Sequence, residues 1–305
     1  RVFSEYRVRD AITAKDVEAA VGLRNRWSLT KDIRLNTNLE RVTTLEGSDA
    51  SDATAVSLGV EYLTNPLWKA TGKIDLRWAD ANDSILNTLG LAYKLSRDWT
   101  LLAKNTINLT DNHKTGNRLQ ERFQLGGAYR QVDTNRWDTL TKIEYKLEQD
   151  ESNASNLIDR DAYIFSTHLN YHPTRRWTFA NQYAAKWVTD TLDGLESKSS
   201  TYLVGLRAIH DLTERWEASV QSGWLSGDAG GKRFVLGAET GYLVTTNLWL
   251  SVGYNWLSYE DADVVGSDFT VDGAYLRMRF KFDEDLFRAE KPSTNKTLEP
   301  KNGSL

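Results

Sequence analysis

The chain has 305 residues, a formal net charge of −4 and a mean hydropathy of −0.53. It contains no cysteine, which excludes a disulfide framework and any thiolate nucleophile or thiolate metal site. Its acidic balance gives no sign of a nucleic-acid partner, and no apolar run approaches the roughly 20 residues of a transmembrane helix. This hydrophilic chain nevertheless carries 11 Trp, 13 Tyr and 9 Phe.

Segments in which polar and apolar residues alternate recur along the chain, each about ten residues long, which is the length of a membrane-spanning strand. The first clear examples are residues 54–63 (TAVSLGVEYL) and 67–80 (LWKATGKIDLRWAD). Residues 118–131 (RLQERFQLGGAYRQ), 245–261 (TTNLWLSVGYNWLSYED) and 275–282 (YLRMRFKF) follow the same pattern. Helical periodicity explains none of these stretches, so the sequence predicts β-strands.

The connections between these segments alternate between two kinds. One kind is short, rich in turn-forming residues and usually followed by tryptophan, as in LSRDW and LTERW. The other kind is longer and acidic, as in residues 148–161 (EQDESNASNLIDRD) and 189–200 (TDTLDGLESKSS). Short turns at one end and long loops at the other are typical of bacterial outer-membrane barrels. We expect about sixteen strands, an even number as such barrels require, from near Val2 to near Phe282.

A barrel strand needs apolar side chains only on its lipid side, so low average hydropathy is compatible with a complete apolar belt. Closure leaves no unpaired strand edge in hydrocarbon. We therefore predict an all-β fold, a transmembrane up-and-down antiparallel β-barrel over residues 1–283, followed by a flexible periplasmic tail over residues 284–305. A soluble β-sandwich also alternates polar and apolar positions, but it would need a larger buried core than this pattern supplies. The chain begins within a strand pattern and without a signal peptide, so we expect its N-terminus to result from processing or from cutting a longer protein.

Two sets of side chains are candidates for function. The tryptophans that follow short turns fit the aromatic girdle at the periplasmic interface, and they are Trp68, Trp99, Trp137, Trp177 and Trp216. Alternation places many basic residues on the lumen face, chiefly Arg24, Arg26, Lys73, Arg77, Arg118, Arg122, Arg130, Arg277, Arg279 and Lys281, together with others such as Arg34, Lys69, Lys94 and Lys104.

The acids expected on the lumen face are fewer, namely Glu40, Glu61, Asp75, Glu144, Glu217 and Glu239. The sequence therefore predicts a net basic lumen that contacts anions or an upstream plug segment, since charges on the wall set the ion preference of a pore. The alternative is that the basic residues pair with the lumen acids and stabilise the wall.

Three segments carry a resemblance to a known group of proteins, namely residues 128–146 (AYRQVDTNRWDTLTKIEYK), 245–270 and 275–287 (YLRMRFKFDEDLF). They resemble the C-terminal barrels of large, repeat-containing outer-membrane proteins of Gram-negative bacteria. The resemblance implies a barrel that holds an extended upstream region at the cell envelope. It implies no catalytic activity.

Motifs for catalysis or metal binding are missing from the sequence. It contains no nucleophile elbow, no phosphate-binding glycine loop and no paired-histidine metal motif. His168 and His172 share a strand face but are about 13 Å apart along the strand, too far to chelate one ion, and we expect His172 at a turn. Ser166 points the same way as His168, without an evident supporting acid. Acidic loops could bind Ca²⁺ but lack regular calcium-loop spacing. We predict a protein that is not an enzyme, with no catalytic residue, no metal site and no cofactor.

Two functions are consistent with these observations. The first is a membrane anchor or conduit for a larger envelope protein, and the second is a porin or export channel for anionic solutes or polysaccharide. The expected partners are outer-membrane lipid and lipopolysaccharide, and an upstream domain or plug of the same polypeptide, with no nucleic acid. The expected location is the bacterial outer membrane, with extracellular loops and periplasmic termini.

Overall fold

A computed structural model describes residues 2–11, 14–46, 52–152, 157–192, 194–228, 231–245, 248–257 and 272–280. The predicted tail, residues 284–305, and Lys281 lie outside these ranges. The described residues form β-strands and connections, with no helix long and apolar enough to cross a membrane among them.

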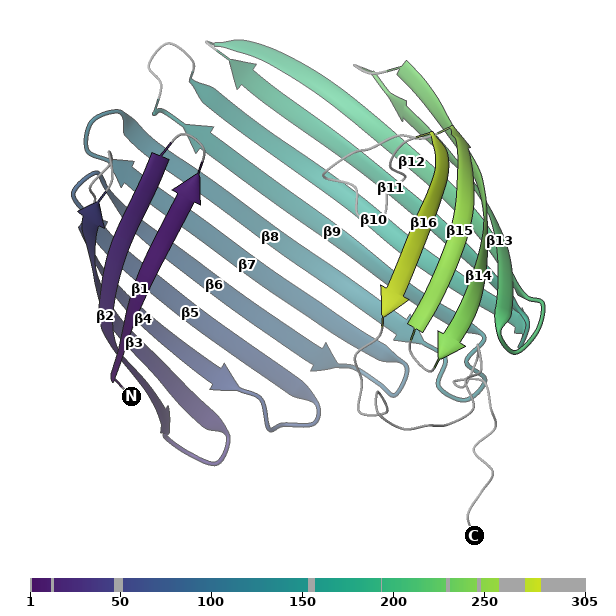
Figure 1. Ribbon diagram of the computed structural model, residues 1–305, viewed down its shortest axis with the longest axis horizontal. Helices are drawn as coiled ribbons and strands as arrows, with labels where there is room; N and C mark the ends of the chain where they lie inside the picture. The colour runs from purple at the N-terminus through teal and green to yellow at the C-terminus, as the bar shows by residue number, and fades with distance from the viewer. Residues whose placement is uncertain are drawn as a thin grey trace. The chain divides into compact units, whose positions relative to one another are not determined.

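Sixteen strands follow one another in a single sheet, in the order β1 to β16, and each described pair of neighbours is antiparallel (Figure 1). The strands are β1 (Val2–Ala11), β2 (Ala14–Ser28), β3 (Ile33–Glu46), β4 (Ala53–Tyr62), β5 (Trp68–Ala79), β6 (Asn82–Lys94), β7 (Trp99–Asn112), β8 (Gly116–Arg130), β9 (Trp137–Asp150), β10 (Ile158–Thr174), β11 (Trp177–Leu192), β12 (Leu195–Asp211), β13 (Trp216–Gly227), β14 (Gly231–Thr245), β15 (Leu248–Leu257) and β16 (Gly273–Phe280). The predicted up-and-down order and the predicted strand number are confirmed.

Several acidic connections are shorter than the sequence predicted. Residues 189–200 were expected to form a loop, yet β11 continues to Leu192 and β12 begins at Leu195. Residues 110–117 likewise contain the end of β7 and the start of β8. Neighbouring strands satisfy each other's backbone N–H and C=O groups wherever they stay adjacent, so polar side chains alone do not end the pairing. In these two stretches, most of the described residues are the polar ends of long hairpins.

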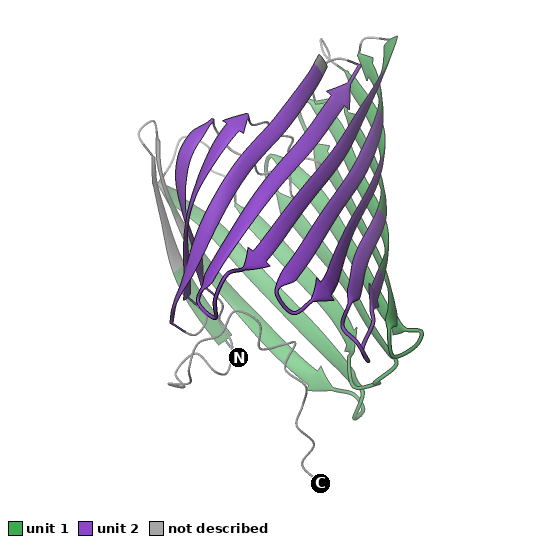
Figure 2. Cartoon of the chain, turned by 90° about the vertical axis from the view of Figure 1, so that its right-hand side faces the viewer, with its two compact units in different colours: residues 1–127, 143–163, 188–198 green, residues 128–142, 164–187, 199–305 purple. Residues whose placement is uncertain are grey.

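Clustering of the strands divides the chain into two compact units, which are described separately (Figure 2). Unit 1 comprises residues 1–127, 143–163 and 188–198, and unit 2 comprises residues 128–142, 164–187 and 199–305. Each unit has only a small buried apolar cluster. The cluster of unit 1 consists of Ala20, Val42 and Ala53, with Ala79 against it, and that of unit 2 consists of Ala184, Leu203 and Val235, with Leu225 against it.

Large apolar side chains are instead exposed along one face of the strands. In unit 1, Leu58 on β4 is 44% exposed and Leu89 on β6 is 52% exposed. In unit 2, Val220 on β13 and Val252 on β15 are each 57% exposed. Many residues at the intervening positions are polar or small, and Ser251, next to Val252, is 1% exposed. Exposing so many large apolar side chains to water is unfavourable, and such a surface is typical of strands that contact hydrocarbon.

Candidate functional site

The polar face is the set of strand positions that alternate with these exposed apolar residues. Nine of the ten basic residues predicted for the lumen belong to strands that the structure describes. Arg24, Arg26, Lys73, Arg77, Arg118 and Arg122 lie in unit 1, and Arg130, Arg277 and Arg279 lie in unit 2. The polar face is therefore the candidate functional site, and its electrostatics depend on how these groups are paired.

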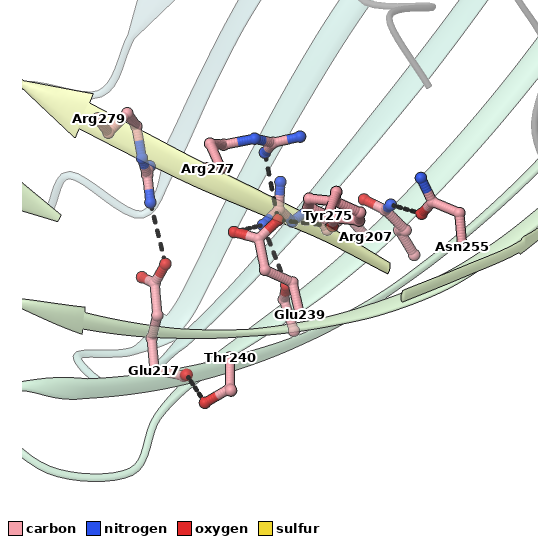
Figure 3. Close-up of polar contacts among 10 residues, drawn as sticks. Arg207, Glu217, Glu239, Thr240, Asn255, Tyr275, Arg277 and Arg279 are labelled. Carbon is pink, nitrogen blue, oxygen red and sulfur yellow. Dashed lines mark hydrogen bonds and ion pairs between the residues drawn. The ribbon is translucent and has the colours of Figure 1, made fainter. Parts of the chain in front are cut away.

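Glu239 on β14 contacts three polar side chains on the polar face of unit 2 (Figure 3). Its side chain is 1% exposed and lies 3.3 Å from the Arg277 guanidinium and 3.4 Å from that of Arg207. The Tyr275 hydroxyl donates a 2.8 Å hydrogen bond to the same carboxylate. A buried carboxylate stays ionised only where such partners offset the cost of removing its charge from water. Arg207, Tyr275 and Arg277 provide that compensation for Glu239.

Glu217 on β13 holds a second arginine of β16. Its carboxylate accepts a 3.0 Å hydrogen bond from Arg279 (Figure 3). The Arg279 guanidinium also lies 5.5 Å from the ring centre of Trp249. Gly253 opposes Tyr275 across the β15–β16 pair, and a Cβ atom at residue 253 would overlap the tyrosine ring. Only glycine leaves room for Tyr275 to lie flat on the wall and reach its carboxylate partner.

The same pairing occurs in unit 1. Glu144 on β9 is fully buried and accepts hydrogen bonds from Arg122 at 2.5 Å and from Gln124 at 2.9 Å. Arg118 donates to Glu148 at 2.5 Å and its Nε lies 3.4 Å from Asp150. The pair of Lys73 and Asp75 measures 2.8 Å, whereas Arg26 and Glu61 are 4.0 Å apart.

These contacts favour the alternative stated from the sequence, in which basic residues pair with acids of the same wall. The sequence analysis missed Glu148 and Asp150 as wall acids because it assigned them to an acidic loop, whereas β9 extends to Asp150. Arg130 instead hydrogen-bonds Asn135 at 3.0 Å, and Arg24 lies 5.3 Å from the ring centre of Phe3. The predicted net basic lumen is not supported by these contacts, because acids of the same wall offset the charge of the paired arginines.

The polar face of unit 1 is hollowed by a cavity of about 950 Å³. Charged residues from β2, β4 and β5 line it, among them Arg24, Arg26, Glu61, Lys73 and Asp75. Amide and hydroxyl groups from β3, β4, β5 and β6 add to the lining, including Asn36, Asn38, Ser57, Thr71 and Thr88. Val60 and Leu86 also line the cavity, so charged and polar groups lie there beside apolar side chains.

The five predicted girdle tryptophans are the first residues of alternate strands, β5, β7, β9, β11 and β13. Trp68 stacks on Tyr62 at 4.2 Å between ring centres, and Trp137 stacks on Tyr171 at 4.1 Å. Trp177 stacks on His210 at 4.3 Å. The tryptophans were predicted from the sequence, whereas the aromatic or histidine ring on the strand before the short turn was not.

The missed signal is a repeat at five short turns, in which a ring precedes the turn and a tryptophan follows it. The ring is Tyr62, Tyr93, Tyr129, Tyr171 or His210, and the tryptophan follows six or eight positions later. Paired amphipathic rings at one end of the strands are typical of a membrane–water interface.

His172 lies within β10 and not at a turn, so that expectation was wrong. Its Nε2 is 3.3 Å from Asp138 and its Nδ1 is 2.9 Å from the Thr178 hydroxyl. The backbone N–H of His172 donates to the Arg136 carbonyl at 2.8 Å. This cluster fastens β10 to its neighbours. No group of three metal-ligating side chains occurs within the described ranges.

His113 follows β7 in the connection to β8 and contacts the β5–β6 turn. Its Nδ1 lies 3.1 Å from the Asp80 carbonyl, and its Nε2 lies 3.5 Å from the Asp83 carboxylate. The Asp80 carbonyl, followed by hydrogen bonding to Asp83, raises the pKa of His113 above its ordinary value. Protonated His113 therefore links two connections of unit 1.

Solved structures of bacterial proteins align with this chain at low sequence identity. The alcaligin outer-membrane receptor FauA from Bordetella pertussis aligns with a TM-score of 0.58 and 9% identity, over 92% of this chain and 55% of the receptor. A bacterial polysaccharide outer-membrane secretin aligns with a TM-score of 0.43 and 13% identity, over 88% of this chain and 91% of the secretin. OccK11 of Pseudomonas aeruginosa aligns with a TM-score of 0.45 and 11% identity, over 92% and 93% of the two chains. No family model matches the sequence, and no curated protein sequence matches it.

The strand order, the two-faced strands and the likeness to FauA define the class. The chain is an all-β, up-and-down antiparallel β-barrel of sixteen strands, of the kind found in bacterial outer-membrane proteins. The narrower resemblance, to C-terminal barrels of repeat-containing proteins, stays a prediction.

Proposed function

We propose that this barrel is an outer-membrane channel for polar solutes. One observation carries the proposal: charged, amide and hydroxyl side chains line a cavity of about 950 Å³ on the polar face of unit 1, while large apolar side chains such as Leu58 and Leu89 are exposed at alternating strand positions. Barrels of sixteen strands leave an aqueous passage unless a segment fills it. The polar face lines that passage.

Pairing of the wall charges determines what such a channel prefers. Arg118, Arg122, Arg277 and Arg279 each have a carboxylate partner at 3.3 Å or less. A paired arginine presents little net charge to a passing ion, since the opposite charge is on the same wall. We therefore infer weaker anion preference than a count of basic residues suggests.

The second candidate is an anchor for a larger envelope protein. The resemblance of residues 128–146 and 275–287 to C-terminal barrels of repeat-containing proteins supports it. In that case a segment of the same polypeptide fills the passage, and the short turns and both termini lie on the periplasmic side with lipopolysaccharide around the opposite end. If the passage is open instead, the barrel of a larger envelope protein would serve as an export channel for anionic solutes or polysaccharide.

Conductance of the purified chain in planar lipid bilayers distinguishes these candidates. A channel gives discrete steps of current that scale with salt concentration, with a small reversal potential in a salt gradient. The heat-unfolded chain at the same protein-to-lipid ratio is the control. A folded barrel that inserts without current contradicts the channel proposal and favours the anchor.

A further inference from the structure

Three lysines of unit 1 differ from the paired basic residues of the polar face. They are Lys69, the second residue of β5, Lys94, the last residue of β6, and Lys104, the sixth residue of β7. All three are exposed. Across the ranges that the structure covers, no carboxylate lies within ion-pair distance of any of them. Their charge is therefore not cancelled by the wall.

The strand register brings these lysines together. Lys69 opposes Ala92 on β6, Lys104 opposes Gly90 on the same strand, and Lys94 lies two residues beyond Ala92. From strand spacing and rise, the Cα atoms of Lys69 and Lys94 are about 8 Å apart, and those of Lys69 and Lys104 about 12 Å apart. Their flexible four-carbon stems allow the ammonium groups to converge on one ligand.

A hydroxyl group occupies the middle of this arrangement. Thr71 opposes Gly90, and its Oγ1 lies 2.9 Å from the place that a Cβ atom on Gly90 would occupy. The side chain of Thr71 therefore leans over the glycine, between Lys69 and Lys104. Ala92 and Gly90 are too small to cover the surface between the lysines.

The nearest acid of the wall is already engaged. Glu61 opposes Thr71 across the β4–β5 pair. It accepts a 2.7 Å hydrogen bond from Asn36 and lies 4.0 Å from Arg26. Three unpaired ammonium groups that can reach a common point repel one another there, and an anion between them removes that repulsion.

We infer that Lys69, Lys94, Lys104 and Thr71, here named the lysine patch, bind phosphate groups of anionic solutes that enter the barrel. Lysine binds phosphate as a point charge, and the threonine hydroxyl donates an additional hydrogen bond. Lys69, Thr71 and Lys94 lie where β5 begins and β6 ends, at the end of these strands that carries the tryptophan girdle, and Lys104 lies nearer the middle of β7. This inference deepens the proposed channel function and rests on it.

Calorimetric titration of the detergent-solubilised barrel with tripolyphosphate tests the patch without relying on conduction. The triple variant Lys69→Gln, Lys94→Gln, Lys104→Gln should bind tripolyphosphate at least ten-fold more weakly than the wild type. This difference should become smaller at high salt, because salt screens the lysine charges. Thr71→Val should weaken binding by about three-fold, the loss of one hydrogen bond. These residues are exposed or at the edge of the cavity, so circular dichroism should show an unchanged strand content.

Arg77 provides the matched control, because it lies toward the other end of β5, opposite Ser84 and Ala55, on the same face. Arg77→Gln removes the same charge as Lys104→Gln and should leave binding unchanged within about two-fold. Equal losses from the two single variants would show a diffuse field and overturn the patch, as would tripolyphosphate binding that survives the triple substitution. A barrel that binds but does not conduct supports the patch and overturns the channel, and one that conducts without lysine-dependent binding does the reverse.

Discussion

Replacing Glu239 by glutamine should destabilise the barrel strongly, because this buried carboxylate joins three partners. At an effective dielectric constant of about 20, each arginine at the observed distances of 3.3 and 3.4 Å attracts the carboxylate by about 5 kcal/mol. Burying the neutral amide costs less than burying the charge, which offsets part of that attraction. Tyr275 also loses a charge-assisted acceptor, worth about 1 kcal/mol.

The net expected cost of Glu239→Gln is about 3 kcal/mol in the free energy of unfolding. Urea titration of the protein in lipid vesicles, followed by tryptophan fluorescence, measures it. The matched control is Glu61→Gln, since Glu61 is 25% exposed and lies 4.0 Å from Arg26. That change should cost less than about 1 kcal/mol.

A double-mutant cycle identifies the source of the loss. Arg277→Met alone and with Glu239→Gln should give a coupling energy of about 1–3 kcal/mol. A Glu239→Gln variant as stable as the wild type, or additive effects in the cycle, would refute the view that these ion pairs stabilise the wall.

Three further predictions concern the faces of the strands and one connection. Leu89→Arg should cost about 2–4 kcal/mol and its neighbour Thr88→Arg less than about 1 kcal/mol, measured by the same urea titration, and equal costs would contradict the assignment of faces. Gly253→Ala should cost about 1–3 kcal/mol by overpacking, and Tyr275→Ala in the same chain should remove most of that cost, which a double-mutant cycle checks. His113 has a raised pKa, so its contribution to stability is complete below pH 6.5, its ordinary pKa, and disappears as pH rises through the raised value. Unfolding of His113→Gln and wild type from pH 5 to 9 should therefore converge at high pH, and a difference that grows with pH would be the opposite result.

Much of the fold was predictable because alternation is a property of neighbouring residues. The contrast between Val252 and Ser251 is visible in the sequence, and it is also the contrast between a 57% exposed and a 1% exposed residue. The tryptophans after short turns were predictable for the same reason. Strand ends were less so, because a paired hairpin continues past the apolar belt as long as its backbone groups have partners.

The pairing of charges on the polar face could not be predicted from local spacing. Arg122 and Glu144, or Arg279 and Glu217, meet only when the register between strands is fixed. Register depends on the whole hairpin and on its turn. Alternation therefore predicted which basic residues share the polar face of the strands, but not that Arg122 and Arg279 are paired while Lys104 has no carboxylate partner among the described residues.

A ring before the turn and a tryptophan after it recur at five short turns. Because these junctions are alike, the chain can gain or lose hairpins between them. A segment that begins with Trp68 and ends just before Trp99 carries two strands, the β5–β6 turn, the β6–β7 turn and one ring of each kind, Trp68 and Tyr93. Loss of that segment would place Trp99 after the turn that follows Tyr62, so the same junction would form again. Duplication of the segment would likewise add two strands without altering any other hairpin. The gene can therefore lengthen or shorten by whole hairpins, and the number of strands stays even at every step.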